Sequence, residues 1–230
     1  VKLVTVFIVF LTVSIPSAAQ PPSSVLEESC DPRLQKGLAD CLTSLRLNTA
    51  AERKALSIAL VDITDPSAPR HAYINPNEMM YAASLPKIAI LLGAFERIKN
   101  GEMDLDETTR DKLTQMIRNS SNQAATEMLN RVGKGYLAGL LQSPQYRLYD
   151  PDRNGGLWVG KEYSKSGAWR RDPLHNLSHG ATVLQVARFY YMLENGQLVS
   201  PESSRQMKSI LAQPAINHKF VKGLKTQHPD

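Results

Sequence analysis

Apolar residues recur along the first part of the chain in two periods, which predict a mixed α and β protein. After a helix start at Asp31-Pro32, leucines recur at helical spacing at positions 34, 38, 42 and 45. The segment 56–65, LSIALVDITD, is apolar and β-branched and ends in an Asp-Pro turn signal, so it is predicted to be a strand. Residues 70–83 are predicted to form a second strand and a turn. The two strands are therefore expected to make a hairpin.

The pattern then becomes helical for most of the remaining chain. After Ser84 an apolar run over 88–98 predicts a helix, with Pro86 in its first turn and Asn100-Gly101 at its end. Residues 104–135 give two helical patterns on either side of a polar interruption at 119–122.

The segment 143–180 is rich in Gly, Pro, Ser, Tyr and charge and shows no clear period. It is predicted to be a long loop with some turns. Two more helices are expected beyond it, one over 181–200 that ends at Asn195-Gly196 and one that begins at Pro201. No internal repeat is visible.

Composition narrows the class of protein. The chain has 230 residues, 42% hydrophobic and 21% charged, which is ordinary for a globular domain. The net charge is +5, and no block of Lys and Arg stands out. We therefore expect a solvated basic surface and no nucleic-acid partner.

The first 19 residues have the layout of a secretory signal peptide. Lys2 precedes a short apolar run over 3–15, and Pro16 and the small residues 17–19 follow it. The run is too short for a stable membrane span. We expect cleavage near Ala19, a linker over 20–30, and a bacterial protein that is periplasmic or secreted.

Export would permit a disulfide between Cys30 and Cys41. A straight helix between them would hold their Cα atoms roughly 15 Å apart, whereas a disulfide needs less than about 7 Å. A bridge forms only if the helix starts late and Cys30 folds back along it. The sequence leaves both the bridged and the free forms open.

Ser84 and Lys87 bring a hydroxyl and an amine together at the predicted start of an apolar helix. Residues three apart on a helix lie on one face. A serine hydroxyl is a weak nucleophile unless a base takes its proton, and a dry site lowers the pKa of a lysine towards that role. The alternative is a serine beside a helix start and a lysine whose ammonium reaches solvent.

The polar interruption at 120–122 adds a second group of candidates. Ser120 has a hydroxyl that can relay a proton between Lys87 and a leaving group, and Asn122 has an amide that can bind both a substrate and the lysine. The alternative is a plain capping turn, because Ser and Asn favour such positions in any case.

Together these stretches resemble the class A β-lactamase and penicillin-binding protein superfamily. SLPK at 84–87 resembles its Ser-x-x-Lys motif, and SSN at 120–122 resembles its Ser-Asp-Asn motif. The flanking sequences NGEMDLDE, MIRNSSNQAATEML and RDPLHNLSHGATVLQVARFYYML are also similar, so that the resemblance covers most of residues 45–215.

The resemblance implies a fold and a set of roles. The fold class is α/β (α+β), with an antiparallel sheet lobe and an all-helical lobe in one domain over 31–230, of which 31–83 belong to the α/β lobe and 84–215 mainly to the helical lobe. It implies Ser84 as the acylated nucleophile, Lys87 as its general base, Ser120 as the proton relay and Asn122 as a substrate anchor.

The sequence also departs from the family pattern. The spacing between Ser84 and Ser120 is shorter than usual, so a loop bordering the cleft is missing. The segment 143–180 lacks the Glu-x-x-Leu-Asn pattern of the family's Ω loop, and Glu162 is its only glutamate. The deacylating base is therefore not identified.

The third family motif, Lys-Thr/Ser-Gly on a strand, is also not found at its usual position. Lys165-Ser166-Gly167 precedes the helix at 181–194, and Lys225-Thr226-Gln227 lacks the glycine. We expect the chain to be truncated at its C-terminus, with an incomplete sheet and the third motif beyond residue 230.

Other classes of function fit the sequence less well. His175 and His179 are four residues apart, but they lie in loop-like sequence without a His-Glu-x-x-His helix, so no metal or organic cofactor is expected. The expected function is an exported serine hydrolase that forms an acyl-enzyme at Ser84 with β-lactams. The alternatives are a penicillin-binding protein-like peptidase acting on D-Ala-D-Ala-like peptides and a non-catalytic cell-wall binding protein. The oligomeric state cannot be predicted.

Overall fold

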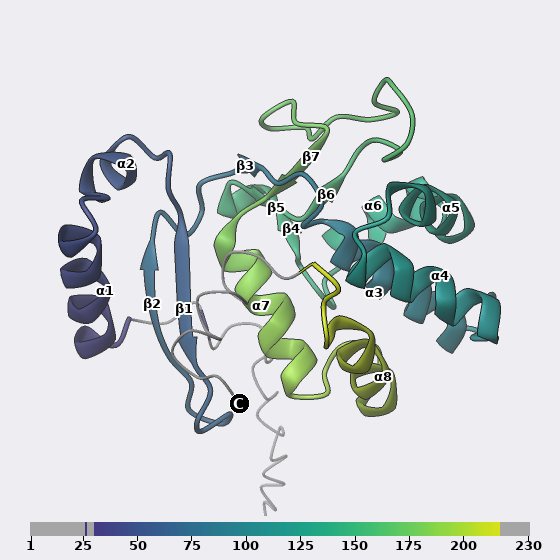
Figure 1. Ribbon diagram of the computed structural model, residues 1–230, viewed down its shortest axis with the longest axis horizontal. Coiled ribbons are helices and arrows are strands. Elements are labelled where there is room, and N and C mark those ends of the chain that lie inside the picture. Colours follow the sequence, from purple (N-terminus) through teal and green to yellow (C-terminus); the bar gives the residue numbers. More distant parts are fainter. Residues whose placement is uncertain (1–25, 27–29, 217–230) are drawn as a thin grey trace, which may run out of the picture.

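The computed structural model describes residue 26 and residues 30–216, which form helices packed around small antiparallel sheets (Figure 1). In chain order the helices are α1 (Pro32–Ser44), α2 (Asn48–Glu52), α3 (Lys87–Lys99), α4 (Glu107–Arg118), α5 (Asn122–Val132), α6 (Lys134–Gln142), α7 (Val183–Glu194) and α8 (Pro201–Leu211). The strands are β1 (Ile58–Asp62), β2 (Arg70–Ile74), β3 (Met80–Tyr81), β4 (Tyr149–Asp150), β5 (Gly155–Gly156), β6 (Trp158–Val159) and β7 (His179–Ala181). In this part of the chain no helix is long and apolar enough to cross a membrane. The α+β fold class expected from the sequence is confirmed.

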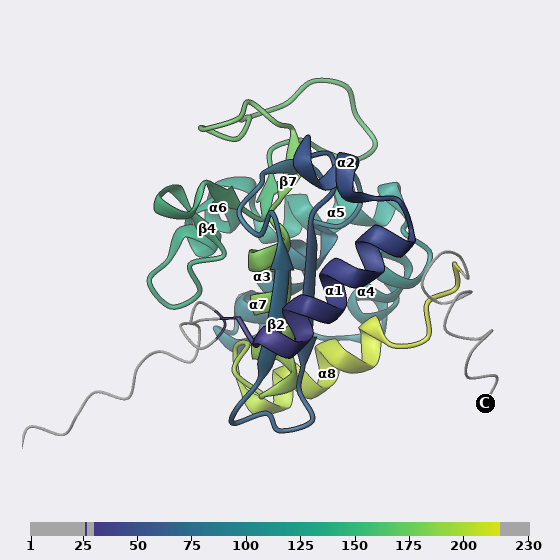
Figure 2. The ribbon, with the colours of Figure 1, turned by 90° about the vertical axis from the view of Figure 1, so that its left-hand side faces the viewer.

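The predicted hairpin is present. Strands β1 and β2 pair antiparallel, from Ile58 opposite Ile74 to Asp62 opposite Arg70. Helix α1 packs against β2 on one face of this pair and α7 packs against β1 on the other (Figures 1 and 2). Among the described residues the sheet therefore has two strands, with a helix on each face.

The start of α1 follows the sequence signal. Asp31 accepts a hydrogen bond from the Leu34 N–H at 2.8 Å, and Pro32 takes the first helical position. Cys30 lies just before this cap and Cys41 lies within the helix, and both are free thiols. The helix thus begins too close to Cys30 for that residue to fold back along it, as a bridge would require.

Helix α3 is the centre of the helical part. It contacts α4, α5, α6 and α8, and its first ten residues, 87–96, are all buried. Its end at Asn100-Gly101 is as predicted, because Gly101 has a φ of +71°, which glycine adopts without strain. Residues 82–86 lead from the end of β3 into α3, so this helix directly follows a strand along the chain.

The prediction of a long loop over 143–180 was wrong in part. The segment contains four short strands: β4 pairs with β5, while β6 and β7 form a three-stranded sheet with β3. It also contributes core side chains, among them Tyr146, Tyr149 and Trp158. Strands of two or three residues are too short to show a period, which is why the sequence pattern did not reveal them.

Three expectations lie outside the described residues. They are the signal peptide at 1–19, most of the linker at 20–30, and the Lys225-Thr226-Gln227 sequence considered as a third motif.

Candidate active site

Lys87 is the first residue of α3, and its side chain lies inside the protein with 2% of the residue exposed. Its Nζ lies 3.2 Å from the Ser84 Oγ, 3.1 Å from the Ser120 Oγ and 2.9 Å from the Asn122 Oδ1. The Ser120 carbonyl oxygen is a fourth acceptor, at 2.6 Å. The structure thus brings together all four residues that the sequence analysis singled out.

Ser84 lies in the turn before α3, so it does not share a helix with Lys87 as the spacing suggested. The Lys87 N–H donates to the Ser84 carbonyl at 3.2 Å, which closes this turn and brings the two side chains to the same side. Ala83 just before it has a φ of +46°, a conformation that costs free energy for any residue with a Cβ. The backbone at Ser84 is therefore fixed by this turn, and the residue is half-buried.

In the segment between α4 and α5 two neighbouring serines make different contacts. The Ser121 Oγ accepts from the Ala124 N–H and caps α5. Ser120 has a φ of +53°, and its hydroxyl faces Lys87 instead. Because Ser121 supplies the cap, the side chains of Ser120 and Asn122 are available to the lysine, and the alternative of a plain capping turn accounts for Ser121 only.

The Lys87 amine lies apart from the carboxylates of the described residues. In the described part of the chain no carboxylate oxygen lies within ion-pair distance of it. Burial disfavours the charged form and lowers the pKa of Lys87 from 10.5 to about 8. A base with a pKa near the working pH is suited to take a proton from a hydroxyl group.

Two aromatic side chains complete the surroundings of Lys87. Its Nζ lies 4.8 Å from the centre of the Tyr163 ring, which is stacked on His179 with 4.2 Å between the ring centres. Burial first, and then the charges of Lys161 and Lys87, lower the pKa of His179 to about 4, so the imidazole is neutral at pH 7. Tyr163 was not predicted to be a site residue, because no spacing or motif around it gives a signal.

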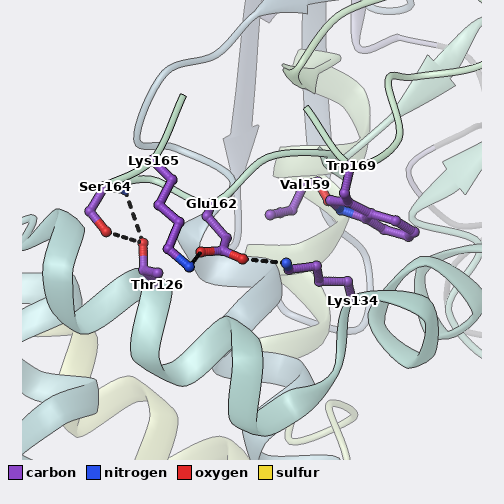
Figure 3. A network of polar contacts seen from close by, with 7 residues as sticks. All are labelled: Thr126, Lys134, Val159, Glu162, Ser164, Lys165 and Trp169. Atoms are coloured by element: carbon purple, nitrogen blue, oxygen red, sulfur yellow. Dashed lines mark hydrogen bonds and ion pairs between the residues drawn. The ribbon is translucent and has the colours of Figure 1, made fainter. Parts of the chain in front are cut away.

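Glu162, the only glutamate of the 143–180 segment, is bound by two lysines (Figure 3). It forms ion pairs with Lys134 at the start of α6 and with Lys165 of its own loop. These hydrogen bonds lower its pKa to about 2. A carboxylate with so low a pKa is a weak base for activating water. Lys165 pairs with Glu162 while its side chain stays mostly exposed, which ties this lysine to the loop.

In the residues that the structure describes, no group of three or more His, Cys, Asp or Glu side chains could hold a metal ion. An apolar groove of about 880 Å³ lies between β1, α7 and α8, and it contains none of Ser84, Lys87, Ser120 or Asn122.

Comparisons with known proteins agree with the fold, and a family match covers part of the sequence. Residues 38–110 match the model of a family described as the β-lactamase enzyme family. No match was found among curated protein sequences.

Three similar solved structures are β-lactamases. The β-lactamase of Sphaerobacter thermophilus DSM 20745 is 16% identical with a TM-score of 0.57, and the alignment covers 79% of this chain and 73% of that one. A variant of the last common ancestor of Gram-negative bacteria class A β-lactamase is 18% identical with a TM-score of 0.55, covering 74% and 69%. A β-lactamase from Chitinophaga pinensis DSM 2588 is 14% identical with a TM-score of 0.54, covering 75% and 70%.

At such identities the structural likeness establishes the fold alone. The family match is a separate similarity in sequence, over a segment that includes Ser84 and Lys87. The resemblance drawn from the motifs is confirmed at this level. Residues 38–110 match the β-lactamase enzyme family, and the chain has the β-lactamase/transpeptidase-like fold.

Proposed function

We propose that the protein is a serine hydrolase that forms an acyl-enzyme at Ser84 with β-lactams. The observation that carries the proposal is the buried Lys87 amine, which lies 3.2 Å from the Ser84 Oγ and 3.1 Å from the Ser120 Oγ and has a pKa lowered to about 8. Similarity to a β-lactamase-like hydrolase supports the class of reaction.

In the proposed mechanism the neutral Lys87 amine takes the proton of the Ser84 hydroxyl as its oxygen attacks the lactam carbonyl carbon. The lactam C–N bond breaks, and the proton reaches the leaving nitrogen through the Ser120 hydroxyl. Asn122, which is exposed and lies beside Lys87, donates its amide N–H to the substrate. Water then hydrolyses the Ser84 ester and restores the free serine.

A penicillin-binding protein-like peptidase acting on D-Ala-D-Ala-like peptides is the second candidate. The state of Glu162 favours it, because two lysines hold this carboxylate and depress its pKa. An acyl-enzyme that meets no activated water persists, and an amine can then accept the acyl group. In either case we propose that the protein is exported to the periplasm or secreted, which N-terminal sequencing of the mature protein would test by a start at Gln20.

Labelling with a fluorescent penicillin tests the proposal. We expect one adduct, which mass spectrometry locates on Ser84, and we expect Ser84→Ala to remain unlabelled. Ser44→Ala, which changes an exposed serine at the end of α1, is the matched control and should label like the wild type.

A second pair of variants separates catalysis from capping. Ser120→Ala should label about 10²–10⁴-fold more slowly, the usual contribution of a proton-transfer group. Ser121→Ala should lose about 1 kcal/mol of stability as a lost helix cap. An adduct on another residue, or full labelling of Ser84→Ala, would contradict the assignment.

A further inference from the structure

The ring of Tyr163 lies between two elements of the site. On one side it contacts the Lys87 amine of α3, and it is stacked nearly parallel on His179 of β7, with an angle of 8° between the planes. The His179 carbonyl accepts from the Ala82 N–H at 3.2 Å, two residues before Ser84. The residue that stacks on Tyr163 is thus also bound to the turn that holds Ser84.

Both chain neighbours of Tyr163 are fixed to the helical region, as Figure 3 shows. Glu162 pairs with Lys134 at the start of α6. On the other side, the backbone N–H and the hydroxyl of Ser164 both bond to the Thr126 Oγ1 of α5, at 3.0 and 2.9 Å. With a contact on either side, the backbone at residue 163 has little freedom to move.

The loop that carries Tyr163 is also closed at its base. Lys161 and Ala168 form an antiparallel bridge, and the N–H groups of Trp169 and Arg170 both donate to the Gly160 carbonyl at 2.9 and 3.2 Å. The Trp169 indole N–H adds a weak bond to the Val159 carbonyl at 3.4 Å (Figure 3). These contacts hold the loop closed, so they fix the position of the Tyr163 ring.

The ring face of Tyr163, and not its hydroxyl, makes the contact with Lys87. The Tyr163 hydroxyl is buried and has no hydrogen-bond partner among the described residues. An apolar ring face this close to the amine keeps water away from it, and the loss of water disfavours its charged form. Phenylalanine at this position would therefore provide the same contact.

We propose that Tyr163 is a positioning residue for acyl transfer, whose clamped ring holds the Lys87 amine between Ser84 and Ser120 and keeps it out of water. The inference rests on the proposed function and extends it to a residue of the 143–181 segment. It accounts for the fixed position of a lysine that has no carboxylate partner among the described residues.

Few other charged or titratable groups surround Lys87. His179 of β7 lies behind the Tyr163 ring, and Lys161 acts on His179. Tyr81 of β3 acts on Tyr163, whose pKa is raised mainly by burial. Because tyrosine and the neutral imidazole carry no charge near pH 7, the pH dependence of the site follows Lys87.

The test compares Tyr163→Phe with Tyr163→Ala. The pKa of Lys87 is measured by NMR titration of protein carrying ¹³Cε-labelled lysine, with Lys87→Arg to assign the signal, and the acylation rate is measured with a fluorescent penicillin from pH 6 to pH 10. We expect Tyr163→Phe to match the wild type in both. Tyr163→Ala admits water, so we expect the pKa of Lys87 to rise by about one unit, which makes acylation about tenfold slower at pH 7.

The outcomes separate the two proposals. A folded Tyr163→Ala with an unchanged pKa of Lys87, or a Tyr163→Phe that loses as much activity as Tyr163→Ala, overturns the role of the ring. If Tyr163→Ala does not fold, Thr126→Val replaces it in the test. Thr126→Val keeps the Tyr163 ring but removes the Oγ1 that anchors the neighbouring Ser164. In that variant a rise in the pKa of Lys87 supports the inference, and an unchanged pKa overturns it. A wild type that is not acylated at Ser84 contradicts the proposed function, whereas the NMR titration still decides what Tyr163 does to Lys87.

Discussion

Four oxygens and one aromatic ring surround the Lys87 amine, and none of them carries a formal charge. Without a charged partner among these groups, burial disfavours the ammonium form of Lys87. The neutral amine has a lone pair that can accept the Ser84 proton. Lys87 is therefore a candidate base, since perturbed groups of this kind cluster at functional sites.

The acylation rate should therefore depend on pH through Lys87. We expect the rate of Ser84 labelling to rise with pH and to level off above a midpoint of about 8, because the neutral amine is the reactive form. The sign for stability follows from the same shift. Between pH 8 and 10.5 Lys87 is protonated in the unfolded chain and neutral in the folded protein. The free energy of unfolding therefore rises with pH through this window, because the cost of burying a charged amine is removed. Stopped-flow labelling and urea unfolding across this range, compared with Lys87→Met, measure the two effects; a flat rate profile would exclude Lys87 as the base.

At the scale of elements, the sequence predicted what has a local signal. The helices at 107–118 and 122–132 were recognised from helical patterns on either side of the polar interruption at 119–122, and α8 because Pro201 begins it. The small helices α2 and α6 were not predicted, and neither were the strands of the 143–181 segment. Those strands depend on partners far along the chain, as when β3 pairs with β7 about 100 residues away, and such pairing leaves no periodic pattern.

A substitution at Gly160 tests whether the loop that carries Tyr163 must stay closed. A Cβ at this position would lie 2.0 Å from the Arg170 carbonyl oxygen, a backbone atom that must move to make room. We expect Gly160→Ala to cost about 1–3 kcal/mol of stability and to slow acylation as the loop opens. Gly139→Ala is the matched control, because nothing lies within 4 Å of its added Cβ in α6, and it should stabilise the protein by about 0.5–1 kcal/mol. Thermal melting and penicillin labelling of both variants give the comparison, and equal behaviour would show that the loop tolerates opening.

At the scale of the whole molecule, the candidate site combines segments that are far apart in sequence. Ser84 comes from the turn before α3, Lys87 from the first position of α3, and Ser120 and Asn122 from the α4–α5 junction. These four residues could be predicted from the sequence, because each motif is short and its residue types indicate its chemistry. Tyr163 could not, since its role depends on ion pairs and hydrogen bonds that fix its neighbours to α5 and α6.

The same arrangement predicts the course of β-lactam turnover. In the proposed mechanism acylation has a nucleophile, a base and a relay, whereas deacylation needs a base that activates water. The only glutamate of the 143–180 segment is held by Lys134 and Lys165, with its pKa lowered to about 2. We therefore expect a burst of one acylation event per molecule followed by a slow steady state, which stopped-flow measurement with a chromogenic cephalosporin resolves. The Glu162→Gln variant should still show both phases, with a slower burst because the loop that carries Tyr163 loses an anchor, if this carboxylate is not the deacylating base. Fast hydrolysis by the wild type without a burst, together with its loss in Glu162→Gln, would instead make Glu162 the deacylating base.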